Sequence, residues 1–157
     1  MTDLREVAPG VLIATSRKMS TNSTLLVGGS DVLLVDPAWM PDELDALASE
    51  IRRRGLRVIG GFATHAHQDH LLWHPDFGAA PRWASARTAA LAASEREALV
   101  SFLGADFPAH LVELMGRVRA AEAIPAVSVP AGFEVELIVH DGHAPGTPPS
   151  GCRRSAC

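Results

Sequence analysis

The first third of the chain carries short apolar runs separated by turn residues, which is the pattern of β-strands. Val11–Ala14, Ser23–Val27 and Val32–Val35 are rich in aliphatic and β-branched residues, and such runs predict strands. Gly28–Asp31 separates the second run from the third and has the composition of a hairpin turn. The third run ends before Pro37, which cannot donate to a strand ladder. The pattern therefore predicts an antiparallel hairpin.

A helix and a further strand follow this hairpin. The helix begins at Pro41, which suits a first helical position, and ends at Gly55, a residue typical of helix ends. Its apolar residues recur at helical spacing and predict one buried face: Leu44, Leu47, Ala48 and Ile51. Arg57–Thr64 is the next predicted strand, so strand, helix and strand form a βαβ unit with parallel strands. Ligands of such sheets bind at the carboxyl ends of the strands.

The second half of the chain predicts more helix than strand. Apolar residues at helical spacing extend over Thr88–Leu103 and Pro108–Ala121. Val127–Pro130 is a short apolar run, and Phe133–His140 alternates between apolar and polar residues, so both are predicted strands. Strands that alternate with helices, without an internal repeat, predict an α/β domain.

Histidines are concentrated at the end of the strand Arg57–Thr64, where four of the seven fall between positions 65 and 74. His65 and His67 are two residues apart, so on extended chain they project to the same side and can bind one cation. Asp69 and His70 follow as the chain turns, and they suit a second cation beside the first. Zinc, iron and manganese accept such nitrogen and oxygen ligands. A lone histidine is usually an ordinary surface or core residue, but packing does not explain this cluster, which predicts a metal centre.

Three segments resemble the metallo-β-lactamase-fold hydrolases. His65–His70 contains the His-X-His-X-Asp-His signature of that family. Leu34–Pro37 resembles the family's strand that ends in an aspartate beside the site, and Gly142–Gly146 resembles its second metal motif. The three segments occur in the family's order, and the resemblance covers residues 10–146.

The resemblance implies a fold, a ligand set and a cofactor. The implied α/β fold is an αββα sandwich, in which two sheets pack face to face with helices outside, and the chain holds its first half and the start of its second. His65, His67 and His143 would bind the first metal, and Asp69 and His70 the second. Asp69 would also orient the metal-bound water and act as a base. The implied cofactor is one or two zinc ions, with iron or manganese as alternatives.

The chain departs from the family at its end. Residues 1–146 are expected to form an incomplete domain, because the family's later half supplies a bridging aspartate and a final histidine, and neither residue type follows His143. Residues 147–157 change abruptly to proline, arginine and cysteine. We interpret them as a frameshifted, disordered tail in which Cys152 and Cys157 have no role, and resequencing the DNA would test this. The rival interpretation is a genuine two-cysteine tail that binds metal or forms a disulfide.

Three of four further polar residues outside the ligand set have two interpretations each. His74 either positions a metal ligand or packs around Trp73. Asp36 is either a turn former or, as the family suggests, a hydrogen-bond partner beside the metals. His140 either lines the site or is structural, and His110 is expected to face solvent.

Composition narrows the range of partners. The 157 residues include 14 Lys and Arg against 18 Asp and Glu, a formal charge of −4, which argues against binding along a nucleic-acid backbone. No apolar run reaches the roughly 18 residues of a membrane span. The N-terminus lacks the basic and apolar regions of a secretion signal. We therefore expect a cytoplasmic protein with a small-molecule substrate and with no nucleic-acid or membrane partner.

The expected reaction is metal-dependent hydrolysis of an ester, lactone, thioester or phosphoester. Zinc lowers the pKa of a bound water to about 7, which supplies a nucleophile at neutral pH. Two alternatives remain. One is a non-catalytic metal-binding remnant that retains only the site of His65, His67 and His143. The other is an iron-dependent oxidoreductase of the same fold.

Overall fold

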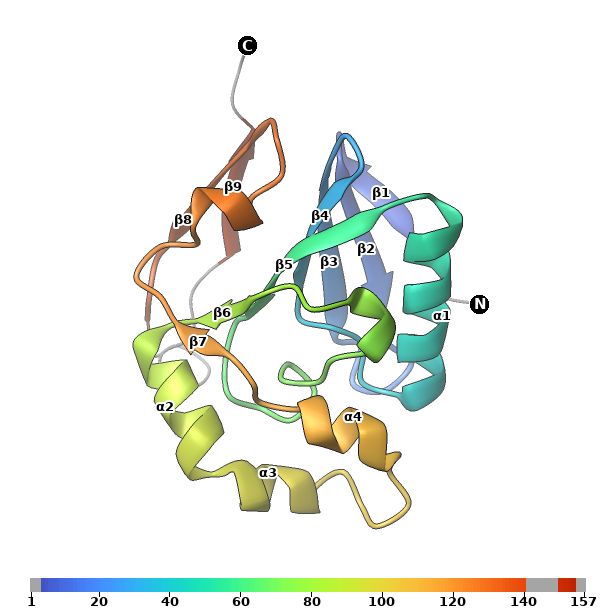
Figure 1. The fold of residues 1–157 in the computed structure, drawn as a ribbon, viewed down its shortest axis with the longest axis vertical. Helices are drawn as coiled ribbons and strands as arrows, with labels where there is room; N and C mark the ends of the chain where they lie inside the picture. The colour runs from blue at the N-terminus through green and yellow to red at the C-terminus, as the bar shows by residue number, and fades with distance from the viewer. Residues whose placement is uncertain (1–3, 141–149, 155–157) are drawn as a thin grey trace.

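The computed structural model describes residues 4–140 and 150–154, and it contains two sheets (Figure 1). The strands of the larger sheet lie in chain order: β1 (Arg5–Ala8), β2 (Val11–Thr15), β3 (Asn22–Gly28), β4 (Asp31–Val35), β5 (Arg57–Ala63), β6 (Arg82–Ala84) and β7 (Arg119–Ala120). Strands β1 to β4 pair antiparallel, and β4 to β7 pair parallel. In the second sheet, β8 (Phe133–Leu137) pairs antiparallel with β9 (Ser150–Arg154).

Four helices and two short turns of 3₁₀ helix connect the strands in the described part of the chain. They are α1 (Pro41–Arg53), α2 (Ala86–Ser94), α3 (Arg96–Ser101), α4 (Ala109–Leu114), η1 (Pro75–Phe77) and η2 (Ala126–Ser128). The predicted helix at Pro41 is confirmed, and its four predicted core residues are the ones that are buried. No helix among the described residues has the length and apolar character needed to cross a membrane.

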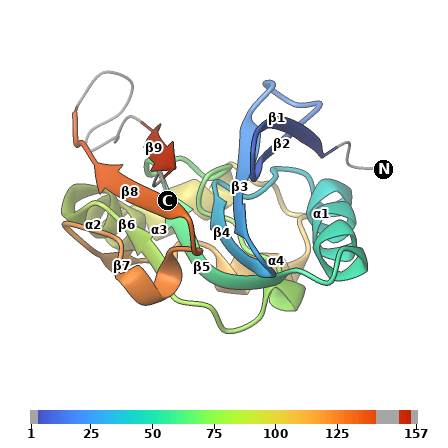
Figure 2. The same cartoon turned by 90° about the horizontal axis from the view of Figure 1, so that it is seen from above.

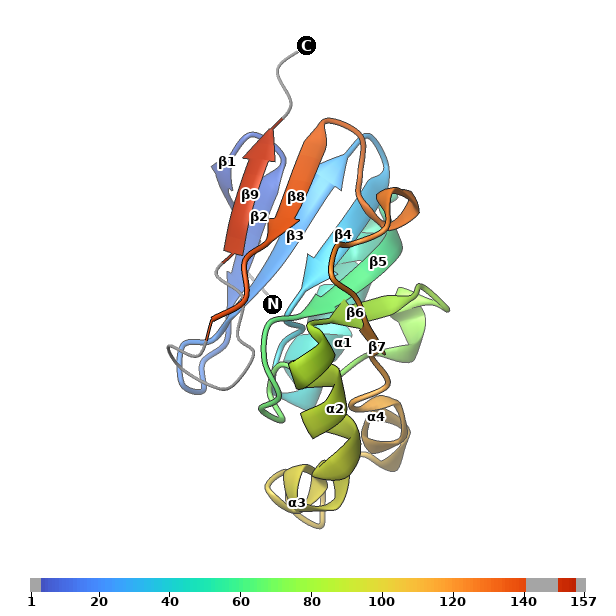
Figure 3. The same cartoon turned by 90° about the vertical axis from the view of Figure 1, so that its left-hand side faces the viewer.

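Two apolar clusters lie on opposite faces of the larger sheet, because successive strand residues point to opposite sides. On β4, Leu34 packs with the buried face of α1, whereas its neighbour Leu33 packs with Phe62 and with Phe133 of β8. Helices therefore cover one face of the seven-stranded sheet, and the two-stranded sheet covers the other (Figure 2 and Figure 3). This helix–sheet–sheet order agrees with the predicted sandwich.

The predicted helices of the second half are shorter than expected. The helix predicted over Thr88–Leu103 is divided at Glu95 into α2 and α3. The helix predicted over Pro108–Ala121 is wrong beyond Leu114, because Gly116 adopts a left-handed φ of 72° and donates its N–H to the Leu71 carbonyl at 3.0 Å. The chain turns there and enters β7.

The late strands also differ from expectation. Val127–Pro130 is not a strand, since its first residues form the 3₁₀ turn η2, and the strand predicted over Phe133–His140 ends at Leu137. Strand β9 lies in the tail for which the sequence predicted disorder. Strands β1 and β6 were not predicted, because four and three residues are too few to establish a period.

Replacing Gly61 by alanine is expected to destabilise the helix-covered face. A Cβ at this position of β5 would lie 2.6 Å from Cη2 and Cζ3 of the buried Trp73 ring. Overpacking of this kind costs about 1–3 kcal/mol, which urea unfolding would measure. Phenylalanine lacks both ring atoms, so Trp73→Phe is expected to remove the clash, and strictly additive effects in the double variant would contradict this account.

Candidate metal centre

The candidate site is built from the loops that follow two neighbouring parallel strands, β4 and β5, at the same edge of the sheet. Asp36 comes directly after β4, and the segment Thr64–His70 comes directly after β5. The parallel register places Val35 opposite Phe62, and the Asp36 N–H donates to the Phe62 carbonyl at 3.0 Å. The two loops therefore leave the sheet side by side, at the edge where α/β sheets bind their ligands.

Asp36 anchors the histidine segment through its carboxylate. It accepts the Thr64 backbone N–H at 2.9 Å and the Thr64 hydroxyl at 2.7 Å, and it lies 2.9 Å from His70 Nδ1. The residue is 7% exposed, and its φ of 48° lies in the left-handed region, which aspartate tolerates better than most residues. The structure thus supports the second interpretation of Asp36, as a hydrogen-bond partner within the site.

His65 and His67 point toward each other, as their spacing predicts. His65 Nε2 lies 3.0 Å from His67 Nδ1, and His65 Nδ1 lies 3.0 Å from the Thr64 hydroxyl. The Thr64 hydroxyl donates its hydrogen bond to Asp36, so its oxygen accepts a hydrogen bond from the N–H at His65 Nδ1. His65 Nε2 then carries a lone pair, which is the form of histidine that binds a metal. His65 is buried and His67 is exposed.

Asp69 and His70 form the second part of the cluster. His70 Nε2 lies 3.2 Å from an Asp69 carboxylate oxygen, and the His70 and His65 ring centres are 3.9 Å apart. Burial alone lowers the pKa of His70, but the hydrogen bonds to Asp36 and Asp69 outweigh it and raise that pKa to about 9. Burial likewise tends to raise the pKa of Asp69, yet the bond to His70 keeps it below its usual value. In the metal-free protein the two residues therefore form a charged pair.

The structure brings four of the five predicted ligands together, namely His65, His67, Asp69 and His70. The fifth, His143, lies outside the described residues. Within residues 4–140 and 150–154, no three histidine, cysteine, aspartate or glutamate side chains are arranged to hold a metal ion jointly. The donor types nevertheless fit zinc. Two nitrogens bound tetrahedrally to one zinc lie roughly 3.3 Å apart, close to the 3.0 Å between His65 Nε2 and His67 Nδ1.

The family model of the metallo-beta-lactamase superfamily matches residues 17–152, a span that contains the anchor Asp36 and the whole histidine cluster. The chain belongs to the metallo-beta-lactamase superfamily. The members of this superfamily share a metal-dependent hydrolase type of fold, and the arrangement at the ends of β4 and β5 agrees with it. No curated protein sequence matches the chain.

Solved structures of other members support the fold. A beta-lactamase domain protein from Burkholderia ambifaria is 23% identical, with 93% of this chain aligned to 50% of that one and a TM-score of 0.62. The DIM-1 metallo-beta-lactamase is 19% identical, with 60% of this chain aligned to 47% of that one and a TM-score of 0.52. Identities this low indicate the shared superfamily fold alone. The chain spans about half the length of these structures.

The described histidines other than His65, His67 and His70 have structural or surface positions. His74 Nε2 lies 2.9 Å from a carboxylate oxygen of Asp45 on α1, and His74 Nδ1 accepts the Asp76 N–H, which caps the 3₁₀ turn η1. His74 thus ties this loop to α1 and positions none of the described ligands. His110 is exposed, as predicted, and His140 is exposed beyond the end of β8.

Thr64 is the functional residue that sequence reasoning missed. The sequence pattern places it as the last residue of a predicted strand, and the neighbouring residues do not indicate a role for its hydroxyl. In this member of the superfamily that hydroxyl bridges Asp36 and His65. The available signal was its position directly before the first histidine, together with an aspartate at the end of the adjacent strand.

The metal-free protein is expected to lose stability as the pH rises from 6.5 to 9. His70 has a pKa of about 9 in the folded chain, against about 6.5 when unfolded. A raised pKa stabilises the fold fully below 6.5, and this contribution is lost as pH rises through 9. A loss on the order of 3 kcal/mol should appear in urea unfolding with EDTA. The same pH series on His70→Gln should lack this component, and an equal loss there would contradict the assignment.

Proposed function

We propose that the chain binds a divalent metal ion, zinc first among the candidates, and hydrolyses a small molecule at this centre. The observation that carries the proposal is the pair of imidazole nitrogens on His65 and His67, 3.0 Å apart and beside a buried acid–histidine pair. His65 and His67 would hold the first ion with His143, and Asp69 and His70 would hold a second. When bound, such an ion lowers the pKa of a water molecule and polarises a substrate oxygen.

The chain's own residues supply orientation and a proton acceptor. Asp36 and Thr64 fix the ring of His65 so that Nε2 is free of a proton, which metal binding requires. Asp69 is 7% exposed, and its lowered pKa keeps its carboxylate ionised at neutral pH. It therefore provides an acceptor for a proton released at the centre. We expect the substrate to be an ester, lactone, thioester or phosphoester.

Metal content measured together with a hydrolysis panel tests the proposal. The purified chain would be loaded with zinc, dialysed and analysed for metal, then assayed on one ester, one lactone, one thioester and one phosphoester. Bound zinc with turnover that EDTA abolishes supports the proposal. One bound zinc without turnover indicates the non-catalytic remnant instead. Bound iron with oxygen uptake indicates the oxidoreductase, and absence of any stoichiometric metal contradicts all three.

A further inference from the structure

Arg82 is a buried cation for which the described residues provide no ion pair. It begins β6, is 8% exposed, and its buried Nη1 has no hydrogen-bond partner among the residues that the structure describes. Its guanidinium carbon lies 5.2 Å from the centre of the Trp73 ring, which attracts a cation but carries no net charge. Burying a charge without a counter-ion is strongly unfavourable, so the position needs a further partner.

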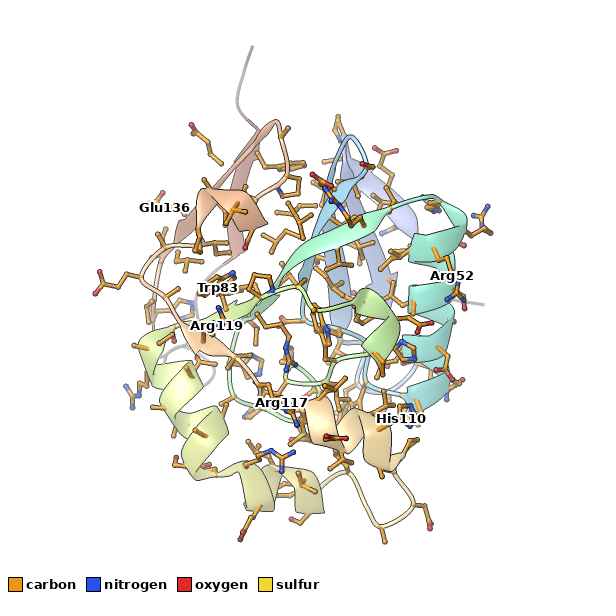
Figure 4. The ribbon with its side chains drawn as sticks, in the orientation of Figure 1. Arg52, Trp83, His110, Arg117, Arg119 and Glu136 are labelled. Carbon is orange, nitrogen blue, oxygen red and sulfur yellow. The ribbon has the colours of Figure 1, made fainter. Side chains whose placement is uncertain are left out.

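The protein groups around Arg82 make its surroundings more positive. Burial and then the charge of Arg117 lower the pKa of Arg82 to about 10, so the guanidinium stays protonated at neutral pH. Arg117 lies in the segment between α4 and β7 (Figure 4), and this segment is held by the bond from Gly116 N–H to the Leu71 carbonyl. Its ion pair is with the exposed Glu113, at 3.4 Å.

The carboxylates of the metal centre are engaged elsewhere. Asp36 and Asp69 both bond to His70, at 2.9 and 3.2 Å. Neither is among the groups that shift the pKa of Arg82. They therefore compensate His70, and neither of them forms an ion pair with Arg82 in the part of the chain that the structure describes.

A small cavity lies against Arg82. It leaves about 10 Å³ for the centre of a water-sized sphere, and its lining includes His70, Leu72, Trp73, Arg82 and Val118. That volume suits one water molecule or one single-atom ion and is too small for an organic substrate. A water would accept a hydrogen bond but would leave the charge uncompensated. A single-atom anion would accept the hydrogen bond and would also compensate the charge of Arg82.

We propose that Arg82 binds a small inorganic monoanion, chloride, in this cavity behind the histidine cluster. The lining is mostly apolar, so the site favours weakly hydrated anions such as chloride and bromide over strongly hydrated fluoride. Bound chloride would complete the packing between Arg82 and the wall that His70 and Trp73 form. Its role is structural, and it requires neither a bound metal nor catalysis.

Chloride-dependent thermal unfolding tests the proposal on the EDTA-treated chain. Sodium chloride would be compared with sodium gluconate at equal ionic strength, since gluconate is too large for the cavity. The wild-type Tm should rise by about 4 °C when chloride reaches ten times its Kd. Bromide should act similarly, and fluoride should act weakly. A wild-type chain with no chloride-specific rise overturns the proposal.

Two variants test whether the chloride-specific rise in Tm depends on Arg82. Arg82→Met removes the charge while keeping most of the side-chain volume, and it should abolish the chloride-specific rise. Arg119→Met is the matched control. Arg119 lies on β7, the strand beside β6, and it is an exposed arginine whose guanidinium lies over the Trp83 ring (Figure 4). It should keep the full response. An undiminished response in Arg82→Met overturns the assignment.

A measurement on the unaltered chain covers the case in which Arg82→Met does not fold. Crystals soaked in sodium bromide should show an anomalous peak within hydrogen-bond distance of the Arg82 guanidinium. Bromide found only on the outer surface, with none at Arg82, overturns the proposal. Because both experiments omit the metal, their failure would leave the proposed hydrolytic function untouched.

Discussion

Replacing His67 by alanine is expected to lower the zinc affinity of the chain by a factor of about 100 or more. Structural zinc sites bind with about 10–16 kcal/mol shared among four ligands, so losing one ligand removes roughly 3 kcal/mol. The measurement is a competitive titration of the metal-free chain with zinc and a chromophoric chelator. The exposed position of His67 means that the metal-free variant should unfold at the same urea concentration as the wild type.

His110→Ala is the matched control for this experiment. His110 is also an exposed histidine, and its ring lies 6.5 Å from that of His74, which is bonded to Asp45 on α1. Its removal should leave zinc affinity unchanged. If His67→Ala retains the wild-type affinity, or if His110→Ala loses it equally, the metal centre is not at the ends of β4 and β5.

Replacing Asp36 by alanine is expected to cost about 3–5 kcal/mol of unfolding free energy, the usual effect of removing one partner of a buried charge pair. The change removes the carboxylate to which the Thr64 N–H, the Thr64 hydroxyl and His70 Nδ1 are bonded. It also places alanine at a φ of 48°, which adds strain. Urea unfolding of the metal-free chain measures the loss.

Two further variants separate the effect of the lost charge on stability from the effect of the backbone strain. Asp36→Asn tolerates the same φ but is neutral, so it should lose less stability while the pKa of His70 falls from about 9 toward its ordinary 6.5. Asp31→Asn on β4 is the control, because Asp31 pairs with an exposed Arg57 at 2.8 Å, and such surface pairs contribute little. An Asp36→Ala variant as stable as Asp31→Asn would show that Asp36 does not anchor the loop.

The parts of the fold that the sequence predicts are those with a clear local period. The hairpin of β3 and β4 and the crossover through α1 combine apolar spacing with turn residues, and both are confirmed. Strands β6 and β7 contain three and two residues, so only their parallel partners in the sheet determine them. The early end of α4 depends on a bond between Gly116 and Leu71, which lie 45 positions apart.

In the candidate site, too, the sequence predicts what depends on neighbouring residues and misses what depends on distant ones. Adjacent imidazoles follow from the two-residue spacing of His65 and His67. The anchoring by Asp36 joins residues 28 positions apart, so the sequence leaves it as one of two interpretations. Arg82 gave no signal, because an arginine in sequence normally indicates an exposed residue, and its burial arises from tertiary packing, in which the Trp73 ring lies 5.2 Å from its guanidinium carbon.

The strand order of the larger sheet has a consequence for biosynthesis. Each strand from β2 to β7 pairs with the one made just before it, so the sheet can grow outward one edge at a time while the ribosome is still translating. The carboxylate of Asp36 is then already in place when Thr64 and the histidines emerge. The nascent chain can therefore bond the segment Thr64–His70 to Asp36 before β6 and β7 have been made.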